Sequence, residues 1–396
     1  MASARTRQFW TSVHRYMGLV TLLFLFLAAV TGCVLCFDKA IDAAINPELF
    51  DRPSMGRALA PVDAMARFEA AHPGLRVTAF PLAVPTGRTI EASVEAAPGH
   101  AALGFDQAFV DPGDGRLVGT RLNGPGWGRR HIVQGIYEFH YTLLAGAIGR
   151  WVMGIAALGW LIGNGVGFYL TFPAKGPFWR KWKRSWQIDW RGRLRWLLLD
   201  LHRASGLWLL VGAMALAFTS VCMNFFDEAF TPAVQAVSPA LPSPFDKAAT
   251  APNNARPIGF ARALAIGRAD AGRRGLDWKA ASLSYAPDRD LYGVMFTPSG
   301  RVTYRWLGPV TYYLGGADGR FVYADDPYHD SGGRKLGRAL YPLHSGQVIG
   351  WLGVAIIFLL GLSTAEMCVT GLYVWWKKRQ SRRAMEKAKR RVKAAA

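Results

Sequence analysis

Two stretches of the sequence, residues 14–37 (HRYMGLVTLLFLFLAAVTGCVLCF) and residues 202–226 (HRASGLWLLVGAMALAFTSVCMNFF), begin with the same motif and continue as apolar runs. Each begins with His-Arg-x-x-Gly and, 17 residues after the histidine, reaches a threonine followed by a small residue. A match that keeps its register over a whole apolar segment indicates an internal repeat. The chain is therefore expected to consist of two related halves.

A second pair of apolar segments repeats with a signature of its own. His140 and His344 are each followed by a glycine 6 residues later and by another glycine 27 residues later. The four apolar blocks cover residues 16–37, 141–172, 205–226 and 347–376, and each reaches the roughly 20 residues that a helix needs to cross a bilayer. We expect four transmembrane helices that form a membrane all-α four-helix bundle of two pseudo-symmetric helix pairs.

The positive charge of the chain, +20 at neutral pH, is concentrated in three short stretches. Residues 1–15, 173–199 and 377–396 hold 21 of the 47 Lys and Arg residues but only 2 of the 27 Asp and Glu residues. All three stretches lie on one side of a four-span topology. The positive-inside rule then places both termini and the basic loop 173–204 in the cytoplasm, with the helices in the bacterial inner membrane. The lipid bilayer, and not nucleic acid, is the expected partner of this charge.

Residues 38–140 and 227–346 are then exported, and both run through the same order of elements. Each contains a helix-like stretch, two strand-like runs and an Asp-Gly hairpin signal, which supplies the positive φ of a tight turn. We expect one α+β module in each exported segment. The expected helices cover 61–71 and 258–274, the strands 75–84, 89–94, 280–285 and 291–297, and the hairpins 109–116 and 313–320.

Four of the eight histidines occupy equivalent positions in the repeat. His14 and His202 begin the two spans that leave the cytoplasm, and His140 and His344 begin the two that return. If the halves pack about a pseudo-two-fold axis, the members of each pair face one another. Two neutral imidazoles that face one another can supply both axial ligands of a b-type haem iron. We therefore predict two haem b groups, one near each face of the membrane.

Other residues lie where they could assist these sites. Arg15 and Arg203 directly follow the cytoplasmic histidines and are expected to bind haem propionates, although the positive-inside bias explains them equally well. Glu366 is the one acid well inside an apolar block, so we expect either a proton or quinol role or a pairing with one of these arginines. His131 lies 9 residues before His140, on the opposite side of a continuous helix, and is expected at the membrane interface or facing substrate.

At these positions the chain resembles the PepSY-associated transmembrane family, which includes iron-regulated inner-membrane proteins of the ferric-siderophore reductase type. The resemblance covers nearly the whole chain and rests on the His-Arg-x-x-Gly and His-x5-Gly openings and on the ending TGLYVWW at 370–376. One departure is Ser220, which stands where the first half has Gly32. The resemblance implies two PepSY-like exported modules, haem in the bundle, and reduction of a ferric siderophore in the periplasm with release of Fe(II).

In this hypothesis electrons enter from a cytoplasmic or quinol donor and pass from the inner haem to the outer haem, and no catalytic residue acts apart from the haems. Hard oxygen ligands hold Fe(II) far more weakly than Fe(III), so one electron is enough to release the iron. Two alternatives stay open. The chain could be a PepSY-type binding or regulatory membrane protein without redox activity, or a quinol-linked cytochrome b, which Glu366 supports.

Overall fold

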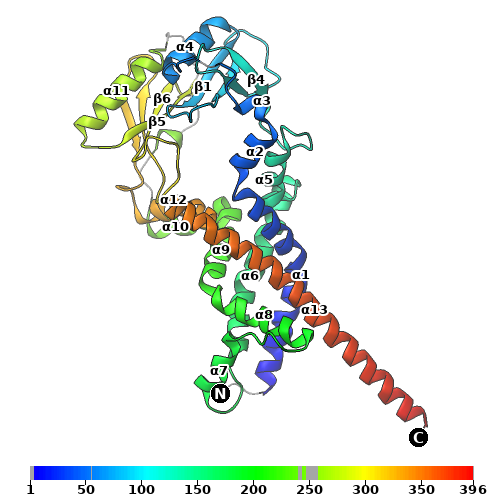
Figure 1. The fold of residues 1–396 in the computed structure, drawn as a ribbon. Coiled ribbons are helices and arrows are strands. Elements are labelled where there is room, and N and C mark those ends of the chain that lie inside the picture. The colour runs from blue at the N-terminus through cyan, green and yellow to red at the C-terminus, as the bar shows by residue number, and fades with distance from the viewer. Residues whose placement is uncertain (1–3, 55, 240–242, 247–256, 396) are drawn as a thin grey trace.

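The computed structural model describes residues 4–54, 56–239, 243–246 and 257–395, and shows an elongated molecule with a helical region below an α+β region (Figure 1). The helices are α1 (Ala4–Leu35), α2 (Asp38–Ile45), α3 (Pro47–Phe50), α4 (Pro61–Ala71), α5 (Ile132–Thr142), α6 (Gly146–Thr171), α7 (Phe178–Lys183), α8 (Leu194–Trp208), α9 (Leu210–Asn224), α10 (Thr231–Val237), α11 (Phe260–Arg273), α12 (Gly332–Ser345) and α13 (Trp351–Ala395). The strands are β1 (Leu75–Pro81), β2 (Ile90–Ala96), β3 (Gln107–Val110), β4 (Leu117–Arg121), β5 (Lys279–Ala286), β6 (Leu291–Thr297), β7 (Val310–Gly315) and β8 (Phe321–Asp325).

Within the described residues, three helices are long and apolar enough to cross a membrane, namely α1, α6 and α13. Helices α8 and α9 pass the same test only together, and they are bent by 71° at the break between them. Large apolar side chains stay exposed along these helices, as at Val20 (72%), Ile148 (76%) and Val211 (84%). Apolar faces of this extent are covered by lipid in a membrane protein.

The expected all-α four-helix bundle is wrong, and one reason lies in its third helix. The break between α8 and α9 follows directly after Ser205 and Gly206, and the Ser205 hydroxyl donates a hydrogen bond to the Leu201 carbonyl at 2.6 Å. Sharp bends form at Gly/Ser pairs and where a hydroxyl bonds back to its own helix. The first half has Met17 where the second has Ser205, and α1 continues past this point without a break.

The second reason is that the two exported segments form one sheet instead of two separate modules. In the described residues the sheet has eight antiparallel strands in the order β4-β3-β2-β1-β5-β6-β7-β8. Strands β1 and β5 join the halves, with Phe80 opposite Leu283. An edge strand leaves backbone N–H and C=O groups unpaired, so the pairing of one edge from each half satisfies both. The fold therefore combines membrane helices with a single shared sheet.

Inside each half the local elements follow the sequence closely. Helix α4 has the expected bounds, and the two hairpin glycines, Gly115 and Gly319, have φ of +82° and +73°. Helices α4 and α11 cover the face of the sheet that is turned away from the helical region (Figure 1). The core beneath them includes Phe68, Phe80 and Phe296, each at most 1% exposed.

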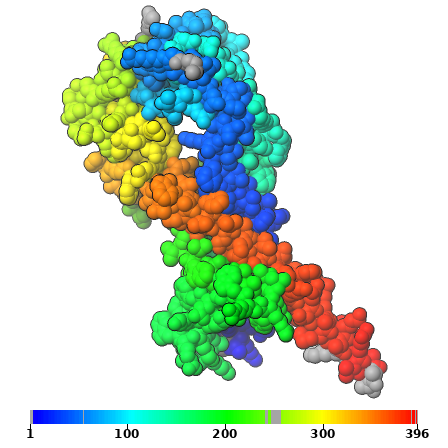
Figure 2. All heavy atoms as spheres, viewed as in Figure 1, coloured from blue at the N-terminus to red at the C-terminus, as the bar shows by residue number. Residues whose placement is uncertain are grey.

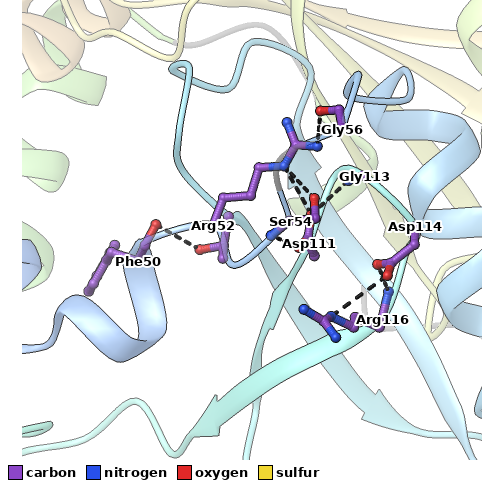
Figure 3. Close-up of polar contacts among 9 residues, drawn as sticks. Phe50, Arg52, Ser54, Gly56, Asp111, Gly113, Asp114 and Arg116 are labelled. Carbon is purple, nitrogen blue, oxygen red and sulfur yellow. Dashed lines mark hydrogen bonds and ion pairs between the residues drawn. The ribbon is translucent and has the colours of Figure 1, made fainter.

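A buried ion pair fastens the first hairpin of the sheet (Figure 3). Arg52 Nε donates to Asp111 Oδ1 at 3.1 Å, and the Asp111 side chain is fully buried. The backbone N–H groups of Ser54 and Gly113 donate to the same carboxylate at 2.9 and 2.7 Å. Burial alone would raise the pKa of Asp111, but these hydrogen bonds and the charge of Arg52 lower it below its ordinary value.

The sheet is carried above the helical region on two supports. Helix α2 packs against α5 on the side of the first half, and α10 packs against α12 on the side of the second. Figure 2 shows an opening beneath the sheet, between the blue segment that contains α2 and the yellow strands of the second half. The underside of the sheet thus faces the end of the helical region across open space.

Candidate functional site

Helices α1 and α8 bring His14 and His202 together, and these two residues are called the inner pair. Their ring centroids lie 6.4 Å apart and their planes are inclined by 71°. Nδ1 of His14 contacts the Gly163 carbonyl oxygen at 3.2 Å, and Nδ1 of His202 contacts the Met367 carbonyl oxygen at 3.1 Å. Because a carbonyl oxygen can only accept, the hydrogen-bond network assigns the proton of each neutral ring to Nδ1. The lone pair of each ring is therefore on Nε2.

Helices α5 and α12 bring His140 and His344 together near the sheet, and these are called the outer pair. Their ring centroids lie 6.3 Å apart with planes inclined by 64°. Thr31 Oγ1 contacts His140 Nδ1 at 2.9 Å, and Thr219 Oγ1 contacts His344 Nδ1 at 3.1 Å. Each hydroxyl already donates its proton to the carbonyl four residues earlier in its own helix, so it accepts from the ring. The outer rings thus also carry the proton on Nδ1.

Three of the four rings rest against a glycine of a neighbouring helix. A Cβ built on Gly167 would lie 3.0 Å from the Cε1 atom of an inner-pair ring, and one on Gly371 would lie 3.1 Å from the other. A Cβ on Gly32 would lie 3.2 Å from Cε1 of an outer-pair ring. At the fourth position Ser220 turns its hydroxyl back to the Leu216 carbonyl of its own helix, at 2.7 Å. These small residues permit close contact between the rings and the helices.

Each pair fits one metal ion bound between two imidazoles. Two rings on opposite sides of one ion, each with a metal–nitrogen bond of about 2.0 Å, have centroids about 6 Å apart. Among the described residues, Nε2 of these histidines forms no hydrogen bond, and no three His, Cys, Asp or Glu residues gather as metal ligands. Each site therefore offers two nitrogen ligands and no more. Haem iron needs only two ligands from protein, because its porphyrin fills the other four positions.

The two arginines beside the inner pair differ in what they contact. Arg203 donates to Asp200 Oδ1 at 2.7 Å and to the Arg184 carbonyl oxygen at 3.1 Å. Its Nε is buried without a hydrogen bond among the described residues. Arg15 forms no ion pair with any residue that the structure describes. Arg15 is thus available to an anion, whereas Arg203 is partly engaged by the buried Asp200.

Glu366 lies one residue away from the inner pair. Its Oε2 accepts a hydrogen bond from Ser205 at 3.1 Å, and its Oε1 is buried without a partner in the described part of the chain. The pairing with Arg15 or Arg203 that the sequence left open is absent from the described residues. Thr370 connects Glu366 with the site, since its hydroxyl donates to the Glu366 carbonyl oxygen at 3.0 Å and contacts His202 Nδ1 at 3.2 Å.

His131 does not join the outer pair. It precedes the first turn of α5, and its ring packs against Gly126, where a Cβ would lie 2.9 Å from the His131 Cβ. His140 is near the other end of the same helix. His131 therefore lies at the side of the helix end that meets the α+β region.

Sequence reasoning found the four histidines but missed the groups that orient them. Thr31 and Thr219 hold the outer rings, and Thr370 with two backbone carbonyls holds the inner rings. The signal for the first two was present, because they stand at equivalent positions 17 residues after the inner histidines. The carbonyl partners carry no sequence signal, since every residue has a carbonyl group.

Comparison with known families agrees with these positions. The sequence model described as the PepSY-associated TM region matches residues 11–378, a range that contains both histidine pairs and the entire sheet. A search of the curated proteins finds no match. The family resemblance drawn from the sequence motifs is confirmed by the match.

Proposed function

Because the chain belongs to the family of the PepSY-associated TM region, and is a membrane protein, we propose that it carries electrons through two haem b groups to a ferric siderophore. The proposal depends on one observation. Four imidazoles meet in two pairs, with centroid separations of 6.4 and 6.3 Å, and every ring keeps its Nε2 lone pair free. Haem bound at these positions would supply reversible one-electron transfer by its iron.

The residues of the chain have distinct tasks in this proposal. His14 and His202 hold the inner haem, and His140 and His344 hold the outer haem. Their Nδ1 partners fix the tautomer and the orientation of each ring, as outer-shell groups do at metal sites. Arg15 and the free Nε of Arg203 are the groups that could receive the propionates of the inner haem.

The proposed direction of electron flow follows from the charge distribution and the place of the sheet. The basic stretches lie on the side of the inner pair, so the positive-inside rule puts that side in the cytoplasm and the sheet in the periplasm of a bacterial inner membrane. A cytoplasmic or quinol donor would reduce the inner site. One electron leaving the outer site converts Fe(III) to Fe(II), and the oxygen ligands of the siderophore then release the iron.

The test is an absorption spectrum of the full chain purified in detergent, before and after dithionite. We expect low-spin haem b bands with about two haems per chain. His14→Ala and His344→Ala should each remove about one haem, from different sites. The reduced protein should be reoxidised by a ferric siderophore with release of Fe(II), which a ferrous-specific dye reports.

A matched control is His329→Ala, because the His329 side chain is 85% exposed and contacts only Asp326 among the described residues. This variant should keep both haems. A colourless protein that remains folded, or equal haem content in His14→Ala and the unaltered chain, would contradict the proposal and favour a binding or regulatory role.

A further inference from the structure

A polar cavity of about 230 Å³ lies between the α+β region and the end of α5 that faces it. Helix α2, strands β3 and β4 with the segment after them, and the first turn of α5 form its walls. The side chains that matter for its chemistry are Lys39, Asp42, Arg121, Arg130 and Gln134. None of them takes part in the histidine pairs.

The floor of the cavity is a buried and rigidly held arginine. The Arg121 side chain is 10% exposed, its Nη1 donates to Asp42 Oδ2 at 2.7 Å, and its Nε donates to Gln107 Oε1 at 2.8 Å. Its guanidinium also lies 5.3 Å from the ring centroid of Phe109. Nη2 forms no hydrogen bond with any described residue, so two N–H donors remain for a ligand.

The rim of the cavity adds two more cationic groups. The exposed Lys39 ammonium forms no ion pair within the described residues. Arg130 lies 3.6 Å from Glu48 and remains 41% exposed. The acid in the floor, Asp42, is neutralised by Arg121, and the remaining wall acid is Asp38, whose Oδ1 accepts from the Lys39 backbone N–H at 2.7 Å. A ligand with several negatively charged oxygen atoms complements this lining.

The cavity also lies close to the outer pair. Gln134 in its wall and His140 are six residues apart on α5, which corresponds to about 9 Å along the helix axis. Asp38 follows α1, the helix whose Thr31 holds the His140 ring. A ligand in the cavity would therefore lie beside the two helices that position the outer histidine.

We propose that this cavity binds the substrate, and that the substrate class is iron chelates of small polycarboxylates. Its volume of about 230 Å³ is below the usual range for ligand pockets of about 300–1,000 Å³, so a compact chelate fits and a bulky one does not. The Arg121 guanidinium would bind one carboxylate, and Lys39 and Arg130 would bind the others. The inference rests on the proposed function for the role of the iron, whereas binding itself requires no electron transfer.

The test measures binding of gallium(III) citrate, a redox-inert analogue of ferric citrate, to the full detergent-purified chain by titration calorimetry. The double variant Lys39→Gln/Arg130→Gln should bind at least tenfold more weakly, because each removed charge costs a charge-assisted hydrogen bond. Lys279→Gln is the matched control, since Lys279 is exposed on β5 and distant from the cavity lining. Gln134→Trp, which fills the cavity without removing a charge, should also abolish binding.

The outcomes separate this inference from the proposed function. Unchanged affinity in both the double variant and Gln134→Trp, with the haem spectrum intact, overturns the cavity assignment and leaves the haem proposal standing. Citrate without metal that binds as tightly as gallium citrate overturns the assignment to a metal chelate. A colourless chain that still binds gallium citrate at this cavity contradicts the haem proposal and supports the binding site.

Discussion

The two halves of the chain place their histidines alike although their backbones differ. The first half passes the helical region with one unbroken helix, α1, whereas the second uses α8 and α9 with a bend of 71°. Even so, each half contributes one ring to each pair, and the two centroid separations differ by only 0.1 Å, at 6.4 and 6.3 Å. The geometry of the rings is thus held by their local partners and does not depend on a straight helix.

The halves differ again at three positions that can be tested. Gly32 in the first half corresponds to Ser220 in the second, and Asp111 in the first hairpin corresponds to Gly315 in the second. The inner pair rests on backbone carbonyls, while the outer pair rests on threonine hydroxyls. Each difference predicts an unequal response to equivalent substitutions.

The largest expected effect is at the glycine beneath an inner ring. Gly167→Val would place a side chain where even a Cβ lies 3.0 Å from His14 Cε1, so the ring must move away from its partner. We expect loss of the inner haem, seen as a fall from about two haems to about one per chain. Gly165→Val on the same helix is the control, because nothing lies within 4 Å of a Cβ there. Retention of both haems in Gly167→Val would show that the close packing is not needed.

The next effect concerns stability and separates the two hairpins. Asp111→Ala leaves Arg52 buried without its partner, which should lower the free energy of unfolding by about 3–5 kcal/mol. The comparison is Asp318→Ala in the second hairpin, where the carboxylate is 58% exposed and lies 3.6 Å from Arg320. Its loss should stay within about 1 kcal/mol. Pulse proteolysis in urea measures both, and equal losses would contradict the assigned role of the buried pair.

The same carboxylate predicts a dependence on pH. Since the pKa of Asp111 is lower in the folded chain, its stabilising contribution is complete above the unfolded value of about 3.9 and is lost as the pH falls through the folded value. Pulse proteolysis between neutral pH and the acid limit should therefore show a steeper acid loss in the unaltered chain than in Asp111→Asn. Parallel curves would exclude Asp111 as a source of the acid sensitivity.

A smaller effect is expected where threonines hold the outer rings. Thr31→Val keeps the shape of the side chain but removes the acceptor of the His140 Nδ1 proton. Loss of such a partner typically weakens metal binding by about 10–100-fold, so haem should be lost first from the outer site during dilution or competition with apo-myoglobin. Thr21→Val is the control, because the Thr21 hydroxyl only bonds back to the Met17 carbonyl oxygen. Equal haem loss in both variants would contradict the proposed role of Thr31.

The sequence predicted the local elements, the repeat and the four equivalent histidines, because periodicity and turn residues act over short distances. It could not predict the joined sheet, since the pairing of Ala79 with Ser284 depends on two edges that are far apart in the chain. The bend after Ser205 had a local signal in the Ser-Gly pair, but the match of this segment with α1 favoured a continuous helix. The cavity around Arg121 arises from three separate segments and has no motif.

The smallest effect should come from exchanging the one residue that breaks the symmetry around the rings. Ser220 bonds back to Leu216 and leaves room for His344, so a serine at position 32 can bond in the same way to the carbonyl of Ala28. The Cβ of Gly32→Ser would lie 3.2 Å from His140 Cε1, which a shift of a few tenths of an ångström relieves. We expect Gly32→Ser to keep both haems with at most a few-fold weaker outer site, and Ser220→Gly to be neutral or slightly tighter. Haem titration of the two variants checks this, and loss of the outer haem in Gly32→Ser alone would mean that the halves are not interchangeable at this position.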